Sequence, residues 1–173
     1  MTRSMLAGMT DYRHQTFEDM LSDLQEWVNS LEQTISIMNE NIEMLEEVGY
    51  WDEVPYDFKA TVEYSLTFYK TSVEEIKDML LEFGKEVKSG HVVRIKKLSK
   101  VAWELNRRFG TDWNRNYGKK EYGKDEFKLV EKVYQEGRNM AADMLDLSNL
   151  AERLEDFVGT KGENVNQGKK RFP

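Results

Sequence analysis

Side chains that could bind an anion are concentrated in one part of this chain. Residues 83–128 contain 13 basic and 6 acidic side chains, a net charge of +7, although the whole chain has a net charge of −7. Positive side chains attract phosphate groups, and aromatic rings can stack on nucleic-acid bases. The predicted anion- or partner-binding patch consists of Arg94, Lys97, Lys100, Arg107, Arg108, Trp113, Arg115, Tyr117, Lys119 and Lys120.

A structural interpretation of the same residues competes with this one. The aromatic rings would then cover the end of a helical core, and the cations would pair with carboxylates elsewhere in the chain. Residues 1–82 provide such carboxylates, because they contain 18 acidic and 5 basic side chains, a net charge of −13. The acidic part is itself either an ordinary solvated face or a surface for a basic partner.

The sequence contains no motif typical of common catalytic or metal sites. The two histidines, His14 and His91, do not follow a glutamate at the Glu-x-x-His spacing of di-iron bundles, and both are interpreted as surface residues. There is no cysteine, and neither a nucleophile elbow nor a phosphate-binding glycine loop occurs. We therefore expect a protein that is not an enzyme and that uses no cofactor and no metal.

Long helices are predicted to position these side chains. Apolar residues recur at alternating steps of four and three from Phe17 to Leu45, and again from Val62 to Val87. This repeat is typical of helices that pack side by side along an apolar seam. Helices are expected over residues 16–48, 57–88, 92–109 and 124–158, with Thr16 as an N-cap, Gly49 and Gly110 as helix ends, and a bend at Gly137.

These elements predict an all-α protein. Its expected fold is an up-down-up-down four-helix bundle built on a long antiparallel hairpin, with a shorter third helix and an aromatic, basic loop over residues 111–123. Residues 1–15 are expected to be a flexible N-terminus, residues 16–158 a single domain, and residues 159–173 a flexible basic tail. No secretory signal or membrane span is apparent, which favours a cytoplasmic location.

Some apolar residues lie outside the two seams. They either widen the buried stripe or form an exposed patch for a partner. They are Met20, Trp27, Ile37, Met44, Phe58, Phe68, Met79 and Leu81.

The order of the elements resembles that of a known class of domain. Two long amphipathic helices are followed by the basic, tryptophan-bearing stretches Lys96–Trp103 and Trp113–Lys120 and by a last helix. This layout, over residues 16–158, is similar to the helical N-terminal domains that precede the NTPase or ankyrin regions of fungal immune-like receptors. The resemblance is one of pattern, and it implies a role in signalling through protein interaction or oligomerisation.

The sequence therefore predicts a non-enzymatic helical interaction module. It would work as an adaptor, an inhibitor or an assembly subunit, with a protein partner or a second copy bound to its helix faces. The alternative is binding of nucleic acid or another polyanion through the basic helix 92–109 and the loop 111–124.

Overall fold

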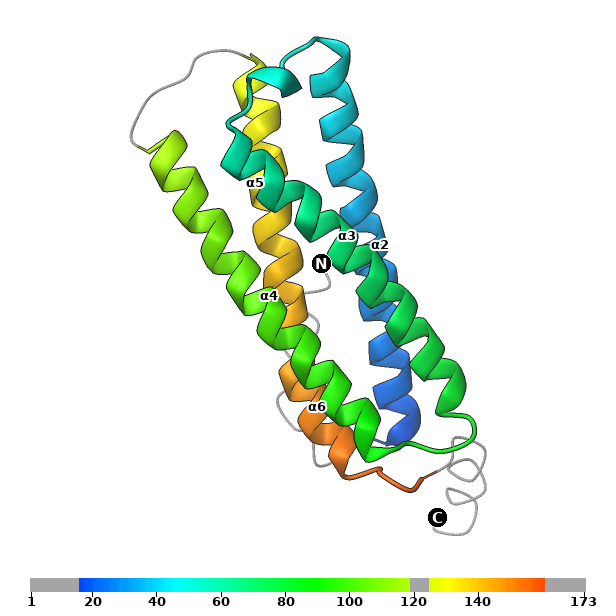
Figure 1. Cartoon of the computed structure of the whole chain (residues 1–173). Coiled ribbons are helices and arrows are strands. Elements are labelled where there is room, and N and C mark those ends of the chain that lie inside the picture. The colour runs from blue at the N-terminus through cyan, green and yellow to red at the C-terminus, as the bar shows by residue number, and fades with distance from the viewer. Residues whose placement is uncertain (1–15, 119–124, 161–173) are drawn as a thin grey trace.

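The computed structural model of the chain describes residues 16–118 and 125–160, which are almost entirely helical and contain no strand. Residues 1–15 and most of the predicted tail, 161–173, lie outside the described residues. The helices shown in Figure 1 are α2 (Phe17–Glu47), the short 3-10 helix η2 (Trp51–Glu53), α3 (Tyr56–Glu82), α4 (Ser89–Asn116), α5 (Asp125–Leu145) and α6 (Leu147–Glu155). The prediction of an all-α protein is confirmed.

Four helical rods pack together around one apolar core. Helix α2 packs against α3 and α5, and α4 packs against α3, α5 and α6. Helices α5 and α6 follow each other along the fourth rod (Figure 1). Since α2 and α4 each pack against both α3 and α5, they occupy opposite corners of the bundle.

The N-terminal end of α2 forms as its sequence predicts. The Thr16 hydroxyl accepts a hydrogen bond from the Asp19 backbone N–H, and the Asp19 carboxylate accepts one from the Thr16 N–H, both at 3.1 Å. This capping box satisfies N–H groups that the first helical turn leaves without partners. At the other end, Gly49 has a φ of 75°, a left-handed conformation that glycine adopts without steric cost.

The connection between α3 and α4 differs from the prediction. Helix α3 ends at Glu82 rather than near Lys88, and α4 begins at Ser89. The prediction that His91 is a surface residue is wrong, because its side chain is buried. Its Nδ1 accepts a hydrogen bond from the Lys88 backbone N–H at 2.9 Å. Its Nε2 donates one to the Glu82 carboxylate at 2.5 Å. These two bonds fix the first turn of α4 and explain why a new helix starts there.

The same connection is tied to the chain after α6. The Val87 N–H donates to the Thr160 carbonyl at 3.0 Å, and the Gly159 N–H donates to the Val87 carbonyl at 2.8 Å. Gly159 and Thr160, the first residues of the predicted tail, are therefore hydrogen-bonded to the body of the protein.

Helix α4 is not short, which corrects the prediction of a shorter third helix. It continues through Gly110 to Asn116, so residues 111–116 are helical rather than part of a loop. A glycine within a helix costs about 1 kcal/mol relative to alanine. Burial of Phe109 and Asp112 on either side of Gly110 outweighs that cost.

Gly137 is a site of close helix packing rather than a bend. Helix α5 passes through it unbroken, and the fourth rod is interrupted nine residues later, at Asp146. A Cβ atom at position 137 would lie only 2.4 Å from Cζ of Phe109. The absence of a side chain therefore lets the Phe109 ring lie directly on the backbone of α5.

We predict that Gly137→Ala destabilises the protein by about 1–3 kcal/mol, because the Phe109 ring must move away from α5. For a chain of this size that corresponds to a fall in Tm of about 2–10 °C. Thermal unfolding followed by circular dichroism measures the change. Gly90→Ala, where nothing lies within 4 Å of the added Cβ, is the matched control. Equal Tm values for G137A and the wild type would refute the packing argument.

Candidate functional site

The predicted aromatic members of the patch, Trp113 and Tyr117, pack onto the core. Trp113 stacks on Tyr134, with ring centroids 4.3 Å apart and an interplanar angle of 10°. Tyr117 is only 6% exposed and meets Phe58 edge to face at 6.1 Å. Tyr117 is therefore buried, and Trp113 is partly buried against the core at this end of the bundle.

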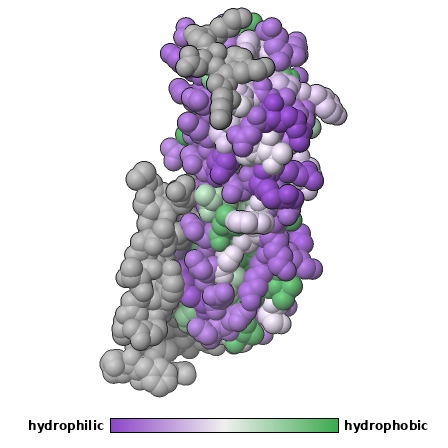
Figure 2. Space-filling model, turned by 90° about the vertical axis from the view of Figure 1, so that its left-hand side faces the viewer, coloured by the Kyte–Doolittle hydropathy of each residue, from purple (hydrophilic) through white to green (hydrophobic). Residues whose placement is uncertain are grey.

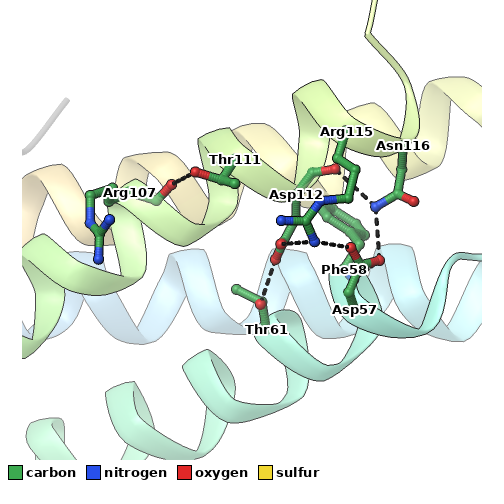
Figure 3. A network of polar contacts seen from close by, with 8 residues as sticks. All are labelled: Asp57, Phe58, Thr61, Arg107, Thr111, Asp112, Arg115 and Asn116. Atoms are coloured by element: carbon green, nitrogen blue, oxygen red, sulfur yellow. Dashed lines mark hydrogen bonds and ion pairs between the residues drawn. The ribbon is translucent and has the colours of Figure 1, made fainter.

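A polar network holds the end of α4 against the start of α3 (Figure 3). The Asp57 carboxylate accepts hydrogen bonds from Asn116 at 2.8 Å, from Arg115 at 2.9 Å and from the Phe58 backbone N–H at 2.9 Å. Beside it, the buried Thr61 hydroxyl donates to the Asp112 carboxylate at 2.6 Å. Arg115, a predicted member of the patch, is therefore part of an interhelical contact.

Two further predicted cations have carboxylate partners. Arg94 makes two hydrogen bonds to Glu75 of α3, at 2.7 and 2.6 Å. Arg107 pairs with Glu104 in its own helix at 2.7 Å. The neighbouring Lys96, outside the predicted patch, is bound to Glu155 of α6 at 2.5 Å. The internal pairing expected from the acidic part of the chain is thus present, and its carboxylates come mainly from helices adjacent to α4.

Three predicted cations remain available on α4. Lys97, Lys100 and Arg108 are exposed, and none has a carboxylate within 4.0 Å among the residues that the structure describes. Lys119 and Lys120 lie outside the described residues. These three are therefore the described cations of the predicted patch that have no carboxylate partner in the described part of the chain.

A groove lies beside Lys100, between α4 and the fourth rod. Its volume is about 320 Å³, and we call it the α4–α6 groove. It is lined by Lys96, Ser99, Lys100, Trp103, Leu145, Ser148 and Glu152. The Ser99 and Ser148 hydroxyls hydrogen-bond to each other at 2.7 Å, and the Trp103 side chain is 57% exposed.

The side of the molecule that carries α4 is mostly hydrophilic, with hydrophobic residues mainly in its lower half (Figure 2).

Sequence reasoning missed most residues of this groove. Trp103 follows Lys100 by three positions, so it lies near the polar side of α4, and a tryptophan placed there is a signal that could have been used. No comparable signal existed for Leu145, Ser148 and Glu152, because they reach the groove only through the interruption at Asp146.

A second, acidic groove lies between α2 and α3, and we call it the α2–α3 groove. It has a volume of about 460 Å³. It is lined by Glu32, Ile35, Ser36, Asn39, Glu40, Glu43, Lys70, Val73 and Glu74.

Of the apolar residues outside the seams, Ile37 and Met44 remain exposed on α2, and so does Leu81 on α3. Met20, Trp27, Phe58 and Met79 are buried, and Phe68 is partly buried against the core, so these five widen the core instead.

Tyr69 is a buried ionisable residue that lies apart from both grooves. Burial raises the pKa of Tyr69, and the nearby Asp143 raises it further, so the phenol stays neutral. Neither groove is lined by Tyr69. Within residues 16–118 and 125–160, no three His, Asp or Glu side chains come together as a metal site requires. We assign no catalytic role to these residues.

Comparison of the chain with protein-family models, with curated proteins and with solved structures returned no match. In the described part of the chain, none of the helices combines the length and apolar character needed to cross a membrane.

We predict that the Asp57 network makes stability depend on pH in the acid range. Burial opposes ionisation of Asp57, but Asn116, the Phe58 N–H and Arg115 favour the carboxylate and hold its pKa below 3.8. Because the folded-state pKa is the lower one, this contribution is present above pH 3.8 and is lost as the pH falls through the folded value. Asp57→Asn should therefore cost about 1 kcal/mol at pH 7 and less at pH 3.

Urea unfolding of the wild type and D57N at both pH values measures the effect. Asp52→Asn, at an exposed position in η2, is the control and should change little. A destabilisation by D57N that is the same at pH 3 and pH 7 would contradict this account.

Proposed function

We propose that this protein is a non-enzymatic helical interaction module that works as an adaptor, an inhibitor or an assembly subunit. The observation that carries the proposal is the α4–α6 groove, where the exposed Trp103 lies beside Lys100. Tryptophan is among the residues that contribute most to protein interfaces, because it buries a large area when it meets a partner. A tryptophan that the fold leaves exposed next to a groove supports a partner-binding surface.

The proposal includes a bundle in which the helices alternate in direction, up-down-up-down. The short connections at residues 48–55 and 83–88 support this order, because they join helices that pack against each other. It also includes a cytoplasmic location. The lack of cysteine supports this location, because disulfides are typical of oxidising compartments.

Binding of nucleic acid or another polyanion is the second candidate function. Lys97, Lys100 and Arg108 favour it, because they are exposed cations without carboxylate partners in the described part of the chain. Burial of Tyr117 and partial burial of Trp113 weigh against it, since Trp103 is then the one predominantly exposed ring near these cations on the described part of α4.

The first proposal predicts that Trp103→Ala removes a protein partner that the wild type retains during purification from the native host. Tyr64→Ala is the matched control, because Tyr64 is a similarly exposed aromatic residue on α3. Quantitative mass spectrometry of the co-purified proteins compares the three samples. Identical sets of proteins for W103A and the wild type would reject the groove as a partner site.

The second candidate predicts a strong dependence of nucleic-acid affinity on salt. Each phosphate contact contributes about 0.9 to the slope of log affinity against log salt concentration on duplex DNA. Replacing Lys97, Lys100 and Arg108 together by glutamine should therefore lower the slope by about 2–3. Fluorescence anisotropy with a labelled duplex measures it, and Lys70→Gln on α3 is the control. A slope that the triple variant leaves unchanged rejects this function.

A further inference from the structure

We propose that the partner of the α4 surface is a second copy of this chain, whose α2–α3 groove receives Lys97, Lys100 and Trp103. This inference rests on the proposed function, that α4 carries a protein-binding surface. It adds the identity of the partner and the surface that the partner uses.

Charge complementarity between the two surfaces is the first argument. Lys97 and Lys100 on α4 have no carboxylate partner among the described residues, and Glu40 and Glu43 in the α2–α3 groove have no cationic partner there. The sequence shows the same separation of charge: residues 1–82 have a net charge of −13, and residues 83–128 have a net charge of +7. Opposite charges on two surfaces steer proteins together and fix their orientation.

The fold prevents these charges from pairing within one molecule. The ion pairs that join α4 to another helix reach α3, as for Arg94 and Glu75, or α6, as for Lys96 and Glu155. Glu32 of α2 pairs with Lys77 of α3. In the described residues no ion pair joins α2 to α4, because these helices occupy opposite corners of the bundle. The remaining charges of α2 and α4 can meet only between molecules.

Apolar residues give the contact a second component. Trp103 is 57% exposed, and Ile35 and Val73, which are 7% and 2% exposed, are the apolar residues that line the α2–α3 groove. Protein interfaces combine an apolar centre with a polar rim. With Trp103 against Ile35 and Val73, the lysines of α4 would lie at the acidic edge of the groove, where Glu40 and Glu43 are found.

The proposed contact joins two different surfaces, so it is heterologous. A molecule whose α2–α3 groove is filled still presents its own α4 surface to a third copy. Contacts of this kind build rings or open chains rather than closed two-fold dimers. Association should therefore continue beyond the dimer as the protein concentration rises.

Charge reversal of the full-length chain tests the proposal. The reversed variants are Lys97→Glu with Lys100→Glu on α4, and Glu40→Lys with Glu43→Lys on α2. Each should associate at least about tenfold more weakly than the wild type, because like charges then face each other. An equimolar mixture of the two variants should regain association, and so should the chain that carries all four changes.

Sedimentation equilibrium over a range of protein concentrations, at low and high salt, measures association. Lys128→Glu with Lys132→Glu on α5 is the matched control, because it changes the net charge equally at exposed positions outside both grooves. Circular dichroism verifies that each variant is folded. High salt should weaken association of the wild type, since the charges lie near the surface.

A wild-type chain that stays monomeric at every concentration overturns the inference, and so does a mixture that fails to associate. A monomeric wild type whose Trp103→Ala variant still loses a host protein would leave the proposed function standing and reject only the second copy. A monomer that binds duplex DNA through Lys97 and Lys100 would also overturn the inference, in favour of the second candidate function.

Discussion

The contact between the Phe109 ring and the backbone of α5 at Gly137 determines how the fourth rod lies on α4. A side chain at position 137 would overlap the ring, with the nearest ring carbon at 2.4 Å. The ring is fully buried there, as are Ala102 and Leu105 of the same helix. The close approach of α4 and α5 therefore depends on one residue that has no side chain.

Adjacency of helices decides which charges are neutralised. The cations of α4 that reach α3 or α6 are paired, whereas Lys97 and Lys100 are not. The net charge of the chain hides this difference, because it adds an acidic α2 and a basic α4 that do not touch. A surface with unmatched charge next to an exposed apolar side chain has the composition of a protein interface.

Much of the helical core could be predicted from the sequence, and the details of the site could not. Periodic apolar residues and the Thr16 cap are local signals, and both hold in the structure. The end of α3, the passage of α4 through Gly110 and the role of Gly137 depend on contacts between distant segments, which local patterns do not contain. The same holds for the patch, because α4 continues to Asn116 and packs Trp113 and Tyr117 onto the core.

The two backbone hydrogen bonds between Val87 and residues 159–160 place the exit of the chain at a defined point. They satisfy both the N–H and the carbonyl of Val87, which the short connection before α4 leaves without helical partners. The last described residues are thus a structural part of the α3–α4 corner, and a chain cut after the final helix would leave that corner with exposed peptide groups. Thr160, the last described residue, therefore lies beside Val87, at the opposite end of α4 from the Asp57 network.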